Sequence, residues 1–356
     1  MPAAAAEEAR RSTQTSQKDS YEPAAAADDL GYRAPHGGAR GGGQRFLVEV
    51  LVHSGVFVER QYCAFAGITH GQKTTDFLRR LVERGYARPI QVGALHRGRL
   101  FHVHHKPLYA AIGQADNRHR KSMVLGRMVE RLMVLDAVLA DRSFAWLGTE
   151  FDKRSYFMRV LQGRVELREF PRLTYGSGPT SIHRYFPDKL PIGIEHSRTE
   201  HVFMYLVTSA VPMDFRLFLL RHSEVLRPLI RWTIRVLVPA PFASAIRVFG
   251  HAAREGLATP IEPSTAEALR WLFAERQRRQ QSPAKTADER FRSASRAYQA
   301  PRFRALFRMW QNDGDATISA AQSPVLREAL QRGDGRVEFV RLTRQYMNLA
   351  SLVGVA

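Results

Sequence analysis

The first ordered part of the chain is marked by apolar residues that recur at helical spacing from Arg45 onward. Ahead of it, residues 1–44 are rich in Ala, Gly, Ser and charge, and they predict a disordered tail without a core. Glycines at 55, 67 and 85 interrupt the apolar pattern, as glycines do where helices end. The spacing therefore predicts three helices, over residues 45–54, 59–66 and 72–84, with an apolar link at 56–58 and a turn at 67–71.

Two extended segments follow the third predicted helix. Residues 86–92 and 100–104 are rich in β-forming side chains, and glycines at 93 and 98 bound the loop between them. This combination predicts a β-hairpin whose connection carries two cations, Arg97 and Arg99.

Helix, helix, glycine turn, helix and hairpin is the order of a winged helix-turn-helix. Residues 45–113 resemble that superfamily, down to the exit Glu83-Arg84-Gly85-Tyr86 and the closing segment Pro107-Leu108-Tyr109-Ala110-Ala111-Ile112-Gly113. The resemblance implies binding of double-stranded DNA, because a helix fits the major groove, where each base pair presents a distinct hydrogen-bonding pattern. The residues expected to contact bases or phosphates are Gln72, Lys73, Thr74, Thr75, Arg79, Arg80, Arg97 and Arg99.

The charge of the chain agrees with such a partner. Fifty-three Lys and Arg against 34 Asp and Glu leave a net charge of +19, which attracts polyanions. The charges of residues 1–44 nearly cancel, whereas residues 45–113 hold ten cations and four acids, so the excess belongs to the folded part. Asp76 would repel phosphate unless it pairs with Arg79 or Arg80, three and four residues further on.

Residues 114–240 mix helical and extended patterns. Apolar spacing predicts a long helix over 118–140 and another over 215–230. Short apolar runs separated by Gly, Pro and charge predict strands over 143–147, 156–161, 165–170, 190–194, 201–208 and 233–238. The final strand, helix and strand indicate a mixed sheet, and the fold class of the whole chain is α+β.

Beyond Pro241 the pattern is helical and basic, with helices expected over 242–256, 264–281, 287–298, 303–311 and 324–331. Between residues 270 and 308 eleven cations face three acids, and they interleave with Tyr298, Phe303, Phe307 and Trp310. Such a run is usually a solvated face, but interleaved aromatics also suit a second nucleic-acid contact. The predicted division is a tail (1–44), a winged helix-turn-helix domain (45–113), an α/β domain (114–240) and a helical region (241–356).

The order of a long helix, strands, Pro187-Asp188, strand, helix and strand looks like a restriction-endonuclease-like core. A winged helix followed by such a core is similar to the replication-relaxation proteins of bacterial plasmids and other mobile genetic elements. This resemblance implies a role in the replication, transfer or regulation of such an element.

The catalytic set of such a nuclease is incomplete in this sequence. An aspartate and a Glu-or-Asp-x-Lys on adjoining strands are needed to bind metal and activate water. Asp188 supplies one carboxylate, but residues 202–208 contain neither an acid nor a lysine. Glu195 lacks a lysine two residues later, and Glu150 lies in a separate acidic group. We expect a nuclease-like scaffold that is not an enzyme and needs no cofactor. The alternative is a Mg²⁺-dependent nuclease that uses Asp188 with Glu150 or Glu195.

Two other classes of function stay open. His102-Val103-His104 matches the histidine–hydrophobic–histidine pattern of relaxase nucleases, in which two imidazoles bind a divalent metal. Helix-turn-helix elements occupy the place where those enzymes have strands, so solvated histidines of the hairpin are favoured. The other class is a protein-interaction module whose positive charge only keeps it in solution.

The remaining predictions concern compartment and assembly. The single cysteine, Cys63, excludes an internal disulfide framework, and the first residues lack the pattern of a secretory signal. No apolar stretch reaches the length of a membrane span. We expect a cytoplasmic protein without membrane contact that binds DNA as a monomer or as a homodimer, a state common among helix-turn-helix proteins.

Overall fold

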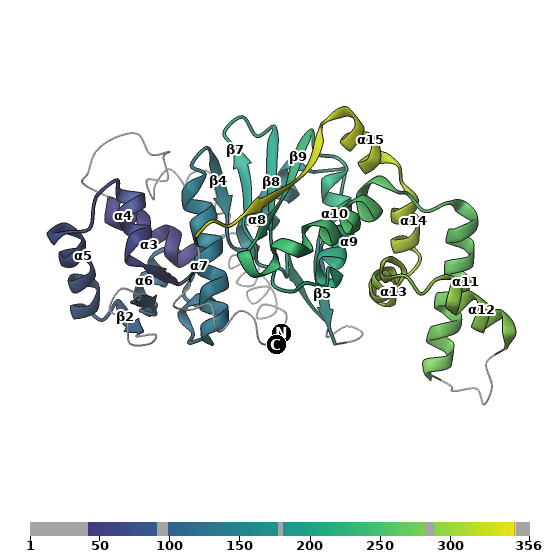
Figure 1. Ribbon diagram of the computed structural model, residues 1–356, viewed down its shortest axis with the longest axis horizontal. Coiled ribbons are helices and arrows are strands. Elements are labelled where there is room, and N and C mark those ends of the chain that lie inside the picture. The colour runs from purple at the N-terminus through teal and green to yellow at the C-terminus, as the bar shows by residue number, and fades with distance from the viewer. Residues whose placement is uncertain (1–41, 91–98, 177–180, 282–287, 345, 347–356) are drawn as a thin grey trace, which may run out of the picture. The chain divides into compact units, whose positions relative to one another are not determined.

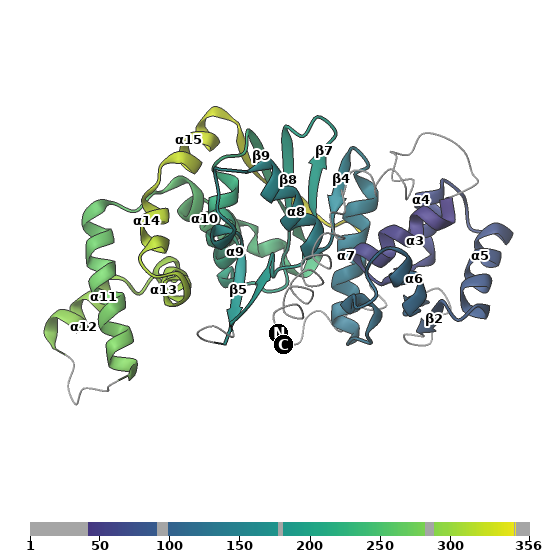
Figure 2. The ribbon, with the colours of Figure 1, turned by 180° about the vertical axis from the view of Figure 1, so that it is seen from behind.

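The computed structural model describes residues 42–90, 99–176, 181–281, 288–344 and 346, which belong to one compact unit. The fold is α+β, as expected, with helices on both faces of a central sheet (Figures 1 and 2). A smaller group of helices and strands precedes this sheet along the chain, and a helical region follows it. Within the described ranges, no helix combines the length and apolar character needed to cross a bilayer.

The first group of elements combines helices with a small antiparallel sheet of strand order β1-β3-β2. Its members are α3 (Gly42–His53), β1 (Val56–Val58), α4 (Glu59–Ala66), α5 (Gln72–Glu83), β2 (Ala87–Ile90) and β3 (Leu100–Val103). The predicted helices and the two extended segments of the hairpin are confirmed. Residues 56–58, predicted as a link, form a strand instead, because Val56 and Phe57 are buried and the backbone pairs with β3. We refer to residues 42–103 as the first unit.

The core of the first unit explains why these elements pack together. Phe46 of α3, Phe57 of β1, Leu78 of α5 and Phe101 of β3 meet in one apolar cluster. Gly67 ends α4 in the left-handed conformation, with φ of 64°, and lets the chain turn into α5. The outer face of α5 is thereby left outside the core.

The connection to the central sheet contains α6 (Lys106–Ala111), the 3-10 turn η2 (Arg118–Arg120) and α7 (Leu125–Ala140). The prediction of one helix over 118–140 is therefore wrong at its start. Residues 118–122 offer no apolar face, and the Asn117 side chain accepts a hydrogen bond from the His119 amide that closes η2. η2 lies tightly against Gly55, where an added Cβ would be 2.5 Å from the His119 carbonyl oxygen.

The central sheet has the strand order β10-β9-β8-β7-β4. The first three strands along the chain form an antiparallel meander, α9 (Met213–Leu226) crosses over, and the last two strands run parallel to β8. The strands are β4 (Phe144–Leu147), β7 (Ile192–Glu195), β8 (Glu200–Leu206), β9 (Arg231–Val238) and β10 (Gly335–Arg341). The helix and all of these strands except β10 agree with the sequence prediction.

The segment between β4 and β7 differs from the prediction. Residues 156–161, expected as a strand, belong to the helix α8 (Glu150–Val160), which begins with a capping box of Thr149 and Asp152. Residues 165–170, also expected as a strand, contain the 3-10 turn η3 (Leu167–Glu169). An unpredicted hairpin follows, formed by two short and largely exposed strands, β5 (Arg172–Tyr175) and β6 (Ile182–Tyr185).

The region after β9 is helical, as predicted, up to its last strand. Its segments are η5 (Ala240–Ala245), α10 (Ile246–Ala253), the π-helical turn η6 (Arg254–Ala258), α11 (Pro263–Gln281), α12 (Glu289–Ala297), α13 (Pro301–Asp313), α14 (Ala316–Gln322) and α15 (Val325–Arg332). Helices α11 to α14 surround a separate core that includes Leu269, Phe273 and Leu306. β10 then pairs with β9, so the expectation of a purely helical region over 241–356 is wrong.

Alternating side chains of the strands face two helical layers. Phe203 and Tyr205 of β8 pack with α8, α9 and α10, whereas Val202 and Met204 pack against α7. Both faces of the sheet are therefore buried, which explains the nearly continuous apolar run in β8.

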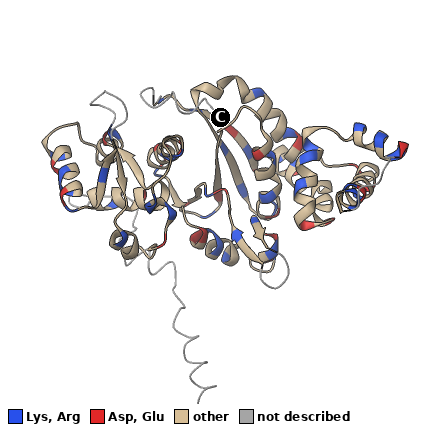
Figure 3. Cartoon of the chain, turned by 90° about the horizontal axis from the view of Figure 1, so that it is seen from below, with Lys and Arg blue, Asp and Glu red and all other residues tan. Residues whose placement is uncertain are grey.

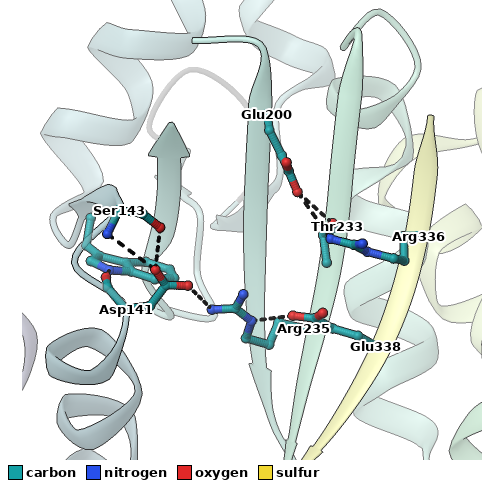
Figure 4. A network of polar contacts seen from close by, with 8 residues as sticks. Asp141, Ser143, Glu200, Thr233, Arg235, Arg336 and Glu338 are labelled. Carbon is teal, nitrogen blue, oxygen red and sulfur yellow. Dashed lines mark hydrogen bonds and ion pairs between the residues drawn. The ribbon is translucent and has the colours of Figure 1, made fainter. Parts of the chain in front are cut away.

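A polar network crosses the face of the sheet that α7 covers (Figure 4). Arg235 on β9 donates from Nη1 to Asp141, which directly follows α7, at 2.8 Å, and from Nε to Glu338 on β10. Glu200 on β8 accepts a hydrogen bond of 3.3 Å from Arg336 on β10. These partners satisfy charges that would be costly to bury alone, and they hold β10 in register at the edge of the sheet.

A second network joins the first unit to α7. The Asp136 carboxylate accepts two hydrogen bonds from Arg60 at 2.8 and 2.7 Å, one from Gln61 at 3.0 Å and one from the Tyr346 hydroxyl at 2.5 Å. Burial alone would raise the pKa of Asp136, but the hydrogen bonds from Arg60, Tyr346 and Gln61 outweigh burial and lower it. Asp136 therefore stabilises the fold in its charged form.

Replacement of this carboxylate tests the network. We expect Asp136→Asn to lower the free energy of unfolding by about 1–3 kcal/mol at neutral pH, because charge-assisted hydrogen bonds are lost. A lowered pKa contributes stability above the ordinary pKa of an aspartate and loses it as the pH falls through the folded-state pKa. Urea unfolding should therefore give curves for the wild type and the variant that converge at acid pH. Asp116→Asn, at an exposed position, is the matched control, and an equal loss there would contradict the assignment.

Candidate nucleic-acid interface

The outer face of α5 presents most of the predicted contact residues to solvent. Gln72, Lys73, Thr75, Arg79 and Arg80 are exposed, while Leu78 and Leu81 on the opposite side are buried. The helix is thus accessible along the side that carries its polar residues. A helix with one polar and one apolar stripe is what the spacing of its residues predicts.

Thr74 does not belong to this exposed face. Its side chain is fully buried, and its hydroxyl lies 3.4 Å from the Cys63 Sγ atom. The prediction that Thr74 contacts DNA is therefore wrong. The spacing contained the signal, since Thr74 precedes Leu78 by four residues and Leu81 by seven and so shares their helical face.

The two arginines of α5 differ in whether carboxylates already pair with them. Arg79 pairs with Asp76 at 3.1 Å and with Glu83 at 3.2 Å, and the hydrogen bonds that it donates to Asp76 first and then to Glu83 raise its pKa. Arg80 donates from Nε to the Asp76 carbonyl oxygen at 3.1 Å. Within the described residues no carboxylate pairs with Arg80. Arg80 is therefore the better-placed cation of the two for an anionic partner.

The hairpin adds further exposed cations beside α5. Arg99 is exposed just before β3, and Arg88 is exposed on β2, while Arg97 lies outside the described residues. Lys and Arg occur over all parts of the fold, interspersed with acids (Figure 3). The sign of the charge alone therefore does not locate a binding surface, and the pairing of each cation matters.

Of the two histidines predicted at the end of the hairpin, His102 is buried and His104 is partly exposed. His102 is only 1% exposed, and its Nε2 atom donates to the His119 carbonyl oxygen at 3.0 Å. Burial lowers the pKa of His102, so the ring is neutral and this nitrogen is already engaged. The His104 Nδ1 atom lies 3.3 Å from the His102 carbonyl oxygen. The expectation of solvated histidines is wrong for His102, which packs the hairpin against η2.

The carboxylates proposed for metal chemistry have protein partners. Asp188 binds Arg221 at 2.7 Å, Glu150 accepts from the Tyr185 amide at 2.9 Å, and Glu195 accepts from the Ser197 and Thr199 hydroxyls at 2.6 and 3.0 Å. In the part of the chain that the structure describes, no group of three His, Cys, Asp or Glu residues could hold a metal ion.

Lys153, which the sequence analysis did not single out, lies close to two of these carboxylates. Its side chain is 1% exposed, and burial lowers its pKa to about 8, although Asp188, Asp152 and Glu150 oppose that shift. Lys153, Asp188 and His222 line one small pocket, and the second carboxylate oxygen of Asp188 is buried there without a hydrogen bond. Recognition of α8 as a helix would have placed Lys153 on the inner face with Tyr156 and Phe157.

The aromatic residues of the helical region are partly buried against its core. Phe307 and Trp310 stack on each other at 6.1 Å between ring centres, and both pack against the core of α11 to α14. The Trp310 indole also donates to Asp315 at 2.7 Å. These contacts account for the interleaved aromatics as packing, and the second nucleic-acid contact stays a prediction.

Comparisons of the chain with protein-family models, with curated proteins and with solved structures find no significant match. The resemblance to winged helix-turn-helix and replication-relaxation proteins accordingly stays a prediction, as does the cytoplasmic location.

The buried lysine gives a test of the pocket that does not depend on activity. A pKa lowered to about 8 means that the unfolded chain binds more protons than the folded chain between that pH and the ordinary pKa of lysine, 10.5. Stability should rise with pH in this window. Lys153→Met should abolish the rise and stabilise the fold at pH 7, by on the order of 3 kcal/mol, since a tenfold change in proton affinity is about 1.4 kcal/mol. Urea unfolding from pH 7 to 10 measures both effects, and exposed Lys121→Met should produce neither.

Proposed function

We propose that residues 42–111 form a winged helix-turn-helix that binds double-stranded DNA through α5. The observation that carries the proposal is the accessible polar face of α5, beside a hairpin whose exposed cations include Arg88 and Arg99. The strand order β1-β3-β2, with β1 between the first two helices along the chain, supports the same interpretation.

In this proposal the residues of α5 divide their tasks by chemistry. Gln72 and Thr75 lie in the first turn and offer amide and hydroxyl groups to base edges in the major groove. Lys73 and Arg80 bind phosphates, which position the protein without reading sequence. Arg79 has a smaller share, because a phosphate must compete with Asp76 and Glu83 for its guanidinium.

The central sheet serves as a scaffold in this proposal. α7, the meander of β4, β7 and β8, then α9 and β9 follow the order expected of a restriction-endonuclease-like core. No acid or lysine stands on β8 beyond Glu200, whose carboxylate is held by Arg336. Together with the sequence resemblance, this supports a DNA-binding protein of a bacterial mobile element, working in replication, transfer or regulation. A homodimer on a two-fold site is the assembly we propose for it.

Charge removal on α5 tests the proposal. Lys73→Ala combined with Arg80→Ala should weaken binding to a duplex and reduce the slope of log affinity against log salt by roughly 1.8, or 0.9 per phosphate. Gln72→Ala should instead reduce discrimination between sequences by about 1–3 kcal/mol and leave the slope unchanged. Fluorescence anisotropy over a salt series measures these quantities.

The control for this experiment removes two cations from another element. Arg247→Ala with Arg254→Ala changes the exposed residues of α10 and η6 by the same charge, and binding should change far less. If the α5 variant binds as the wild type does, α5 is not the DNA-binding helix. A wild type without salt-dependent DNA binding would favour the protein-interaction module.

The second candidate function is a Mg²⁺-dependent nuclease. The observation in its favour is the pocket in which buried Lys153 faces Asp188, since a lysine beside a carboxylate is part of such a catalytic set. Asp152 and Glu150 are the other carboxylates whose charges act on that lysine, whereas Glu195 is not among them. Arg221 would have to release Asp188 before a metal could bind.

Nicking of supercoiled plasmid DNA tests this second function. An active nuclease should nick in the presence of Mg²⁺ or Mn²⁺, and Asp188→Asn should reduce the rate by about 100-fold or more, because metal binding is lost. Asp214→Asn, an exposed carboxylate in the first turn of α9, is the matched control. Nicking that persists in Asp188→Asn would remove this site from consideration.

A further inference from the structure

A second group of cations gathers where the first unit meets the central sheet, away from α5. It comprises residues from four separate segments of the chain, namely Arg118 of η2, Arg127 and Arg131 of α7, Arg184 of β6 and Lys189 just before β7. We call the four exposed members, Arg118, Arg127, Arg184 and Lys189, the junction cations.

Apolar packing brings these segments together. Met123 just before α7, Leu125 at its start and Leu190 two residues before β7 pack against the same cluster of buried residues. Lys189 lies close enough to Arg118 and His119 of η2 for their charges to interact, although these residues are far apart along the chain. Lys189 adopts φ of 56°, a left-handed conformation that is unfavourable for a residue other than glycine. The fold thus holds Lys189 at the surface in a conformation that is unfavourable for it.

The junction cations continue from the hairpin of the first unit. Arg88 on β2 lies opposite His102 on β3, and the His102 ring donates to the carbonyl oxygen of His119 in η2. The His119 ring in turn lies 2.5 Å from the Arg131 guanidinium of α7. A direct line of contacts therefore leads from the exposed edge of the hairpin to η2 and α7.

The group contains more positive charge than its neighbouring carboxylates neutralise. Burial lowers the pKa of Lys189, and repulsion by Arg118, Arg131, Arg184 and Arg127 lowers it further. Arg127 pairs with Glu130 at 2.6 Å, and Arg184 lies 4.0 Å from Glu150. Among the described residues neither Arg118 nor Lys189 has an ion pair, and the carboxylate next to Lys189, that of Asp188, is bound by Arg221. Like charges held close together without counterions are stabilised by an anionic ligand.

We propose that the junction cations form a second phosphate-binding site, which holds the backbone of the same DNA duplex that α5 engages. Phosphodiesters fit this group better than a single small anion does, because the cations come from separate segments of the chain and all four are exposed, although Lys189 also lines the small pocket of Lys153. The proposal rests on the proposed function of α5 and extends the DNA-binding surface past the hairpin to the edge of the central sheet. Its role is affinity and orientation, since phosphate contacts carry no sequence information.

Substitution of the two unpaired members tests the site in the full chain. The variant is Arg118→Gln with Lys189→Asn, because asparagine tolerates the left-handed conformation at position 189. With a mixed-sequence duplex of about three helical turns, we expect roughly tenfold weaker binding near 0.1 M salt and a salt slope smaller by roughly 1.8. Arg118→Lys with Lys189→Arg keeps the charges and should restore both quantities.

Three comparisons separate the outcomes. If the Lys73 and Arg80 variant loses affinity but the junction variant does not, the second site is wrong and the function of α5 stands. If neither variant loses affinity, the proposed function falls as well. If the control pair at Arg247 and Arg254 loses as much as the junction variant, net charge explains the effect and the site is wrong. Thermal unfolding of each variant shows whether the fold is intact.

A junction variant that binds duplex normally but no longer binds anionic phosphatidylserine vesicles would assign the cations to a membrane surface and overturn the proposal.

Discussion

The helix α7 is the element on which the arrangement of this protein depends, because it belongs to two cores at once. Leu135 completes the core of the first unit, while Val129, Leu132 and Val138 pack against the central sheet. Asp136, one residue after Leu135, gathers the side chains of Arg60, Gln61 and Tyr346. A single helix with both sides packed fixes the first unit relative to the sheet, since neither can move without opening a core. The surface that α5 presents is therefore held by the same packing that positions η2 and the start of α7.

The net charge of +19 is distributed in a way that the total does not reveal. Many arginines act inside the protein: Arg216 binds Glu255, Arg221 binds Asp188, and Arg235 joins Asp141 to Glu338. These guanidiniums satisfy carboxylates and backbone carbonyls and are not available to a partner. Other cations, among them Lys73 on α5 and Arg118 on η2, are exposed and form no ion pair within the described residues. The cations open to a polyanion are therefore only a part of those that the composition counts.

The sequence predicted those elements whose periodicity was strong and whose ends were marked by glycine. The helices α3, α4 and α5 are of this kind, whereas the apolar pattern alone predicted α9 and the buried strands β8 and β9. The short apolar run at Tyr156 and Phe157 predicts a strand within what is the helix α8, although the capping box at Thr149 marks the start of a helix. The strands β5 and β6 were not predicted, because their side chains are largely exposed and no alternation of apolar and polar residues marks them. β10 belongs to the central sheet because it pairs with β9, about a hundred residues earlier in the chain, and no local sequence pattern predicts such a pairing.

The candidate site was predicted in part, for the same physical reasons. Gln72, Lys73, Thr75 and Arg80 lie where helical spacing puts them, but Thr74 faces inward with Leu78. Arg79 forms ion pairs with Asp76 and Glu83. Helical spacing predicted only the pair with Asp76. Lys153 was missed because residues 156–161 were predicted as a strand, and because a buried lysine is an exception to the rule that charged side chains stay in water. The junction cations come from segments far apart along the chain, and only the tertiary fold brings them together.

The place of β10 in the sheet has a consequence for how the chain is made. β9 ends at Val238, whereas the strand that covers its outer edge begins only at Gly335, after the whole helical region. While the ribosome synthesises the residues in between, the backbone N–H and C=O groups along that edge of β9 cannot form hydrogen bonds with β10. An unpaired edge next to a largely apolar sheet invites pairing with other chains. During this interval the nascent protein needs either rapid folding of the intervening helices or protection by a chaperone.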